Sequence, residues 1–267
     1  MFKMPSLLEM LTAGVHFGHQ TSRWHPKMSQ YLFGSRNGVH VINLEKTQEE
    51  LQKSLDYVKT LASQGKVILF VGTKKQAKVL IQTAADACGM PYITERWIGG
   101  LLTNFPEVRT RLKKYKNLKE QFATHEIERY TKKEQVRKQK DLEKMDRYLL
   151  GIVGLDKIPD AIYIADMRTE KTAIAEANRM NVPIVGVCDS NVNPEKAEYI
   201  IPANDDAVNA IKMIADLLAV AANEGKADWE QTKLKMAAEK VKEEKTAPVR
   251  AKVEKIERRA VKIAESV

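Results

Sequence analysis

The sequence has 267 residues, of which 43% are hydrophobic, 30% charged and 6% aromatic. A chain of this length can bury one large or two smaller cores, and no apolar run approaches the roughly 20 residues of a membrane-spanning helix. The start lacks the apolar segment of a signal peptide, and Cys88 and Cys188 lie in apolar contexts typical of reduced core residues. We therefore expect a cytoplasmic protein with neither disulfide bonds nor a membrane partner.

The net charge of +9 is unevenly distributed along the chain. Residues 106–150 carry 14 basic and 8 acidic side chains, whereas residues 151–224 carry 6 basic and 12 acidic ones. A charge that served solubility alone would not need this segregation. The distribution indicates that one face meets a polyanion, while another faces water or basic protein partners.

The N-terminal part predicts a short helix, a loop and a hairpin. Ser6 and Glu9 have the spacing of a capping box, which begins a helix. Residues 15–28 follow neither the helix nor the strand period, so we expect a loop there. Residues 31–38 are typical of a hairpin with an Asn-Gly turn, which leads into a strand at 39–44.

Helices and strands then alternate as far as residue 95. A second capping box, at Thr47, predicts a helix, and the apolar run 67–71 is typical of a buried parallel strand. A third capping box, at Thr73, predicts a helix that ends near Ala87. A short strand at 91–94 follows, so this part predicts an α/β body.

The stretch from Arg96 to Phe105 joins this body to a strongly charged region. Its Gly99-Gly100 pair can adopt backbone angles that other residues avoid, which suits a sharp joint. Beyond it, apolar side chains recur at spacings of three and four, which predicts an antiparallel helical hairpin with one apolar stripe. The stripe of its first helix contains Val108, Leu112, Tyr115, Leu118 and Phe122. We therefore expect hairpin 106–150 to be inserted into one sheet domain formed by residues 1–105 and 151–224.

The alternation resumes after the hairpin. We expect strands at 160–166, 182–189 and 199–202, and a helix through Ala221 that Asn204 or Asp205 can cap. Alternating strands and helices predict right-handed crossovers and a parallel sheet with helices on both faces. Residues 225–267 are rich in Lys, Glu and Ala, with few apolar anchors, so we expect a charged and mobile tail.

A set of basic and aromatic side chains forms the candidate RNA-binding site. Arginine and lysine bind phosphates, and rings among them can stack on bases. Two of the lysines follow a strand at a predicted helix start, where free amides and a partial positive charge attract anions. The alternative is a solvated basic face. The candidates are Arg23, Trp24, His25, Lys27, Arg36, Lys74, Lys75, Arg96, Arg109, Arg111, Lys113 and Lys114.

Acidic residues near predicted strand ends form a candidate site for a divalent cation. We place Asp189, Asp205 and Asp206 in it together with His16, and either His16 or His19 is near enough to contribute a ligand. Carboxyl ends of parallel strands meet at one edge of a sheet, where open α/β folds bind ligands. The competing interpretation is that each aspartate serves helix capping and turn chemistry.

Catalytic patterns are not found in this sequence. It lacks a Gly-x-Ser-x-Gly elbow, a Gly-x-Gly-x-x-Gly fingerprint after a strand, and the complete phosphate loop of nucleotide hydrolases. We therefore expect a protein that is not an enzyme and requires no cofactor. A rival hypothesis is a flavodoxin-like protein that binds a nucleotide or sugar phosphate at Asp166 and Asp189.

Several segments resemble bacterial ribosomal protein two of the small subunit. They include 14–21, 24–28, 33–47, 70–77 and the joint 96–105, although His25 stands where that family most often has asparagine. The resemblance implies a flavodoxin-like sheet with an inserted helical hairpin. It also implies a structural role, not as a homo-oligomer, in the small ribosomal subunit. The implied partners are small-subunit ribosomal RNA and other small-subunit proteins, among them ribosomal protein one, which helps to load messenger RNA in translation.

Overall fold

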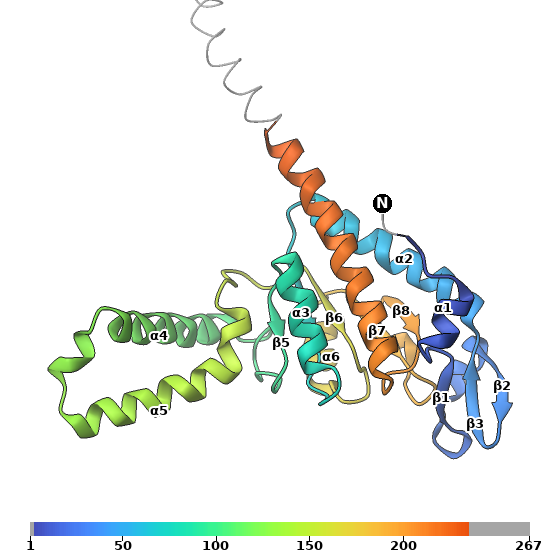
Figure 1. Cartoon of the computed structure of the whole chain (residues 1–267), viewed down its shortest axis with the longest axis horizontal. Coiled ribbons are helices and arrows are strands. Elements are labelled where there is room, and N and C mark those ends of the chain that lie inside the picture. The colour runs from blue at the N-terminus through green and yellow to red at the C-terminus, as the bar shows by residue number, and fades with distance from the viewer. Residues whose placement is uncertain (1–2, 235–267) are drawn as a thin grey trace, which may run out of the picture.

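The computed structural model describes residues 3–234, which form a five-stranded sheet, a smaller sheet and a projecting helical hairpin (Figure 1). The large sheet has the strand order β5-β4-β6-β7-β8, and every neighbouring pair is parallel. This is the flavodoxin-like order, in which the second strand lies outside the first, so the predicted α/β class is confirmed. The strands are β4 (Ile68–Val71), β5 (Tyr92–Ile93), β6 (Ala161–Ile164), β7 (Ile184–Cys188) and β8 (Tyr199–Pro202).

Two buried clusters cover the two faces of this sheet. Phe70 and Tyr163 belong to one cluster, together with apolar residues of α2 (Leu44–Ser63), α3 (Lys78–Cys88) and the helix at 208–234. The neighbouring strand positions point to the opposite face, as the two-residue period of a strand requires. There they pack against α6 (Lys171–Arg179) and the base of the hairpin. No helix within residues 3–234 has the length and apolar character needed to cross a bilayer.

Two predicted capping boxes are wrong. Helix α2 begins before Thr47, because Asn43 caps it by accepting hydrogen bonds from the amides of residues 45 and 46. Helix α3 begins at Lys78 without a side-chain cap, because Thr73 hydrogen-bonds to the carboxylate of Glu170 instead. The Thr47 hydroxyl likewise has a distant partner, because it donates to the carbonyl of Pro202 at 2.6 Å. In both cases a threonine that could have capped its own helix contacts a residue distant in sequence.

The N-terminal region forms an antiparallel sheet in the order β1-β3-β2. Its strands are β1 (Phe17–Gln20), β2 (Leu32–Arg36) and β3 (Val39–Ile42), and the predicted Asn37-Gly38 turn joins the last two. The prediction of a loop throughout 15–28 is wrong, because residues 17–20 pair with β3. This strand has no two-residue alternation of its own and exists through tertiary pairing. The preceding and intervening helices are α1 (Leu7–Thr12), η1 (Thr21–Arg23) and η2 (Pro26–Tyr31).

The hairpin projects from the end of the molecule opposite this small sheet (Figure 1). It consists of α4 (Phe105–Ala123), η3 (Glu126–Arg129) and α5 (Lys132–Leu149), and it returns to the body through η4 (Leu150–Ile152). Leu112 and Tyr115 are buried, whereas Leu118 and Phe122, nearer the tip, are only half-buried. The Tyr115 hydroxyl hydrogen-bonds to Asp146 of α5 and thereby ties the two helices together. The predicted apolar stripe is therefore buried at the base of the hairpin and becomes more exposed towards its tip.

A single carboxylate holds the joint in place. One oxygen of Glu176 accepts hydrogen bonds from the Trp97 indole at 3.0 Å and from the Gly100 amide at 2.8 Å. Its other oxygen accepts from the amides of Leu102 at 3.1 Å and Thr103 at 3.4 Å. Burial alone would raise the pKa of Glu176, but these hydrogen bonds outweigh it and hold the pKa below its ordinary value. The chain at the joint therefore turns around the Glu176 carboxylate of α6, whose charge is balanced by these hydrogen bonds.

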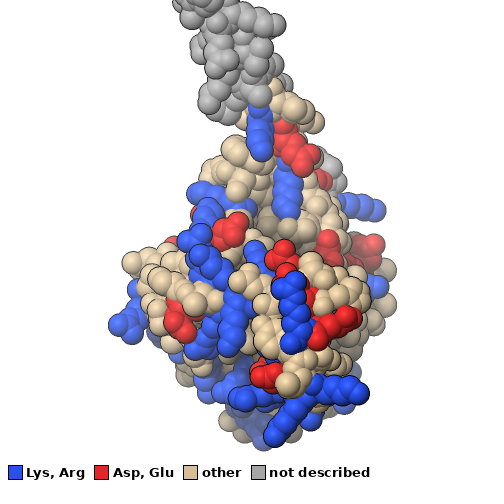
Figure 2. Space-filling model, turned by 90° about the vertical axis from the view of Figure 1, so that its left-hand side faces the viewer, with Lys and Arg blue, Asp and Glu red and all other residues tan. Residues whose placement is uncertain are grey.

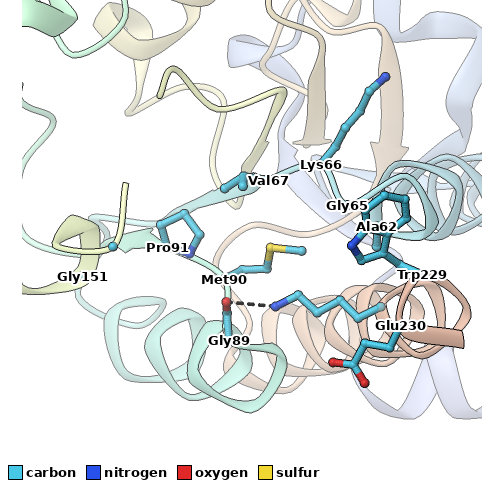
Figure 3. Close-up of a pocket in the computed structure, with 12 residues that line it drawn as sticks. Ala62, Gly65, Lys66, Val67, Gly89, Met90, Pro91, Gly151, Trp229 and Glu230 are labelled. Carbon is cyan, nitrogen blue, oxygen red and sulfur yellow. Dashed lines mark hydrogen bonds between the residues drawn. The ribbon is translucent and has the colours of Figure 1, made fainter. Parts of the chain in front are cut away.

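The helix at 208–234 extends beyond the predicted tail boundary. The composition predicts a mobile tail from residue 225, but residues 225–234 are helical and contact the body. The Lys226 ammonium donates to the carbonyl of Gly89 at 3.0 Å, and the Trp229 indole lies 2.6 Å from where a Cβ on Gly65 would stand (Figure 3). These side chains help line a cavity of about 430 Å³. The boundary at 225 is therefore too early, and residues 235–267 lie outside the described part.

Candidate functional site

A basic groove lies at the base of the hairpin. Its rim carries Arg111 and Lys114 of α4 and Lys144 of α5, and its floor includes Ile98 and Met145. The cavity has a volume of about 430 Å³. The sequence predicted the two cations of α4 but missed Lys144, whose signal was its position one residue before Met145 of the apolar stripe. Cations above an apolar floor can bind phosphate and cover a base or sugar at once.

The cations around this groove are almost entirely uncompensated. Arg109, Lys113 and Lys114 are exposed, and none has a salt bridge or side-chain hydrogen bond within residues 3–234. Arg111 contacts Glu107 one turn away at 3.4 Å, an exposed pair of the kind that contributes little to stability. Figure 2, which views the molecule from the hairpin side, shows Lys and Arg side chains spread over this face. The Lys and Arg side chains at the hairpin base can therefore pair with a polyanion without breaking strong internal contacts.

The N-terminal candidates are divided between free and engaged groups. Arg23 is exposed in η1, and Trp24 is 40% exposed with its ring 5.3 Å from that of His40. The His25 ring accepts a hydrogen bond from the Lys27 amide at 3.3 Å, and the Lys27 ammonium pairs with Glu195. Arg23 and His25 line a second cavity, which lies near the carboxyl ends of β6 and β7. Lys27 is thus the least available member of this group.

Three further candidates stand apart from both cavities. Arg36, at the end of β2, Lys75, before α3, and Arg96, before the joint, are exposed. They line neither the groove at the hairpin base nor the second cavity. The structure therefore gathers only part of the predicted RNA-binding set into shaped sites.

Lys74 is not an exposed phosphate ligand. Its ammonium lies 2.9 Å from Asp205, 2.6 Å from Asp206 and 3.5 Å from Asp166, and its side chain is 20% exposed. Burial disfavours its charged form, but the hydrogen bonds to Asp206 and Asp205 outweigh this and raise its pKa. The sequence grouped Lys74 with the RNA-binding cations, and the structure instead commits its charge to an acidic cluster.

His19, not His16, joins that acidic cluster. The His19 imidazole lies 3.0 Å from Asp189 and 3.4 Å from Asp206, and its hydrogen bond with Asp189 raises its pKa against the opposing effect of burial. The His16 ring instead packs on Phe17 at a centroid distance of 4.0 Å. His19 lies on β1, which residue patterns did not reveal as a strand, so its placement depended on tertiary pairing.

The cluster carries more negative than positive charge. Asp166, Asp189, Asp205 and Asp206 face one lysine and one histidine. Burial, together with the neighbouring Asp166 and Asp189, raises the pKa of Asp205 to about 7. Ligand atoms of His19, Asp205 and Asp206 lie within 4.8 Å of one another, so one imidazole and two carboxylates can converge on a cation.

The same charges argue against the rival nucleotide or sugar-phosphate site at the acidic strand ends. A phosphate placed between Asp166 and Asp189 would meet carboxylates whose nearby ammonium, that of Lys74, is already engaged. Like charges in a partly buried site repel strongly. The carboxyl edge of the sheet at these aspartates therefore suits a cation and not an anion.

Comparison with known proteins identifies the family. Residues 10–225 match the family model of ribosomal protein S2. The chain is also 46% identical over 221 residues to the small ribosomal subunit protein uS2 of Coprothermobacter proteolyticus, an alignment that covers 83% of this chain and 82% of that protein. The match includes the joint, the hairpin and every strand of the large sheet. The chain therefore belongs to the ribosomal protein S2 family, a family of structural ribosomal proteins.

Proposed function

We propose that the chain is a structural component of the small ribosomal subunit, on the cytoplasmic ribosome, and that it binds small-subunit ribosomal RNA through its hairpin base. The observation that carries this proposal is the set of exposed cations on α4 that lack partners among residues 3–234. A cation without an internal partner gains most from a phosphate, since it loses no existing ion pair.

The groove at the hairpin base supports this assignment by its shape. Its cations project from two helices whose apolar sides are packed together, so the charged sides remain accessible. The apolar floor, which includes Ile98 and Leu149, can cover a ribose or base while the rim contacts the backbone. Contacts of this kind fix position on RNA and depend strongly on salt.

Replacement of Arg109, Arg111, Lys113 and Lys114 by alanine tests the proposal. We expect weaker binding to transcribed small-subunit ribosomal RNA, and a salt slope reduced by roughly 0.7 to 0.9 for each phosphate that the variant no longer neutralises. The matched control removes four exposed cations near the hairpin tip, Lys132, Lys133, Arg137 and Lys140, and should have the smaller effect. Unchanged affinity and slope in the first variant would show that the hairpin base does not bind the RNA.

We also propose that the small sheet receives ribosomal protein one, the partner that the family resemblance implies. Phe33 is 80% exposed, Phe17 is 54% exposed and Trp24 is 40% exposed in this N-terminal region. Large exposed rings on a charged protein are typical of protein interaction surfaces. Phe33→Ala should weaken binding of ribosomal protein one and leave RNA affinity unchanged. Equal binding by the variant and the parent would exclude this surface.

Finally, we infer that the acidic cluster holds a divalent cation. The supporting observations are the convergence of His19, Asp205 and Asp206 and the raised pKa of the buried Asp205. A mixed imidazole and carboxylate set suits zinc or manganese better than magnesium, which prefers oxygen ligands and water. Bound there, the ion would supply the missing positive charge and hold the N-terminal sheet against the large sheet.

A further inference from the structure

A cavity of about 330 Å³ lies near the carboxyl ends of β6 and β7, and the proposed function does not use it. Three stretches of chain meet there: the loop that contains Arg23 and His25, the residues 167–174 after β6, and the residues 191–196 after β7. It lies beside α6, on the face of the sheet that also carries the hairpin base. The cavity is therefore a built feature of the body and not part of the hairpin.

Four cations surround this cavity. Arg23, Arg168, Lys171 and Lys196 are exposed, and within the described chain none of their side chains has a salt bridge or hydrogen bond. Glu195, the carboxylate next to Lys196, pairs with the Lys27 ammonium. Like charges gathered at one cavity repel, so the arrangement favours a ligand with more than one negative charge nearby.

The lining of the cavity combines buried apolar side chains with two asparagines, of which Asn193 is engaged because its side-chain oxygen accepts a hydrogen bond from the amide of Glu195. Met167, Ile174 and Val192 line it and are 2%, 4% and 6% exposed. Asn191 lies among them, and both its Nδ2 and Oδ1 atoms are shielded from solvent and have no hydrogen-bond partner within residues 3–234. An unpaired buried amide is unusual, because native structures satisfy nearly all such groups. This amide offers one donor and one acceptor side by side, the pattern that the edge of a nucleobase presents in return.

We propose that this cavity takes one unpaired nucleotide of RNA. The Asn191 amide, whose polar atoms are shielded from solvent in the unliganded chain, turns into the cavity and hydrogen-bonds to the edge of the base. The base then lies on Met167, Ile174 and Val192, and the four cations contact the flanking phosphates. The inference rests on the proposed RNA-binding function and adds a second binding site, remote from the hairpin. A phosphate alone could accept from the Asn191 Nδ2 but would leave the apolar side chains and the acceptor Oδ1 unused, whereas a nucleotide uses the cations, the apolar side chains and both amide atoms. The volume also suits a single base with its ribose.

The charged part of the proposal is tested by Arg168→Ala combined with Lys171→Ala. We expect this pair to weaken binding of transcribed small-subunit ribosomal RNA about tenfold and to lower the salt slope by roughly 1.4, which corresponds to two phosphates of a single strand. The matched control, Arg179→Ala with Lys212→Ala, removes two exposed cations outside the cavity, the first from the other end of α6. An effect of the cavity pair no larger than that of the control would overturn the proposal.

The base-reading part is tested by Asn191→Leu, which removes the amide at similar size. We expect lower RNA affinity at an unchanged salt slope, and loss of protection of one nucleotide in chemical probing of its Watson–Crick edge. Thermal stability should stay the same or rise, because the amide has no partner in the described part of the protein. A purely structural asparagine would instead lower stability and leave the protection pattern intact. Retained protection in Asn191→Leu overturns this part.

One further measurement separates this inference from the proposed function. The four nucleoside 5′-monophosphates and inorganic phosphate are titrated into the full chain by calorimetry. If the wild type fails to bind ribosomal RNA at all, the proposed function fails with it. Saturable binding of a free nucleotide in that case would overturn the RNA assignment of the cavity and identify a small-molecule site. If both cavity variants bind ribosomal RNA as tightly as the parent chain, the proposed hairpin site is retained and the proposed nucleotide site in the cavity is overturned.

Discussion

The joint at the hairpin and the acidic cluster at the carboxyl edge of the sheet satisfy their charges in opposite ways. At the joint, the carboxylate of Glu176 accepts hydrogen bonds from four neutral N–H groups. At the edge, Asp166 and Asp189 also accept hydrogen bonds from neutral donors, but the four carboxylates share only Lys74 and His19 as positive partners, and the pKa of Asp205 is raised to about 7. A charge satisfied by fixed dipoles rigidifies its surroundings, whereas an excess of like charge attracts a ligand. The joint thus has a structural role, whereas the excess of carboxylates at the edge is what the proposed cation would balance.

The largest effect is expected where the hairpin returns to the body. A Cβ added at Gly151 would stand 2.2 Å from the carbonyl oxygen of Tyr92 in β5, which cannot move without breaking the sheet edge. Gly151→Ala should therefore lower the free energy of unfolding by about 3 kcal/mol in urea titrations of the full chain. Gly154→Ala is the control, since nothing lies within 4 Å of its added Cβ. Equal stability of the two variants would show that the junction is not tightly packed.

A smaller loss is expected at the acidic edge. Lys74→Met leaves Asp205, Asp206 and Asp166 without their shared ammonium and should cost about 2 kcal/mol, below the full value for a buried pair because Lys74 is partly exposed. The neighbouring exposed Lys75→Met should change stability by less than about 0.5 kcal/mol. Thermal and urea unfolding measure both. If the two variants lose the same stability, the cluster does not depend on Lys74.

At the joint, removal of the charge should have a pH signature. Glu176→Gln should lower stability by about 1.5 kcal/mol at pH 7, because amide oxygens accept hydrogen bonds less strongly than a carboxylate and the site is partly exposed. The folded-state pKa of Glu176 is depressed, so its contribution is present above the ordinary value near pH 4.5 and is lost as pH falls through the folded-state pKa. The free energies of unfolding of the parent chain and of Glu176→Gln should therefore become equal as the pH falls from 7 to 3. A constant difference would contradict the role of the ionised carboxylate.

The smallest shift concerns the proposed cation. Zinc at ten times its dissociation constant should stabilise the metal-free chain by about 1.4 kcal/mol, seen as a rise in Tm. Asp206→Asn should abolish this rise, because it removes one of the converging ligands, while the exposed Asp86→Asn should not. A rise of equal size in Asp206→Asn would mean that zinc binds elsewhere. Repetition with magnesium shows whether the imidazole contributes to selectivity.

Much of the fold could be predicted because it depends on local periodicity. The continuous apolar run at β4 and the three-and-four spacing on α4 each indicate their element type without knowledge of any partner. Strand β1 could not be predicted in this way, since residues 17–20 pair with β3 without any alternation of their own. Thr47 and Thr73 misled for a related reason, because each hydroxyl found a partner that sequence spacing does not reveal.

The basic character of the candidate site could be predicted from the sequence, but the particular residues that form it could not. The unpaired cations of α4 were visible as charges beside an apolar stripe, whereas Lys74 looked equivalent and is engaged by carboxylates. Arg168, Lys171 and Lys196 were hidden inside a segment whose net charge is negative. The fold collects them with Arg23 at one cavity, which a sum over the segment cannot show.

Local residue patterns specify the α/β class, the inserted hairpin and the sign of charge on the projecting helices, because periodicity and composition act over a few turns of chain. The choice of which polar groups meet belongs to the folded chain as a whole. Glu176 reaches the Gly100 amide across 76 residues, and Lys74 reaches Asp205 across 131. Such contacts follow from the order of the strands and the direction of the crossovers. The local hydrophobic pattern does not depend on which polar groups the strand order brings together, so it cannot reveal them.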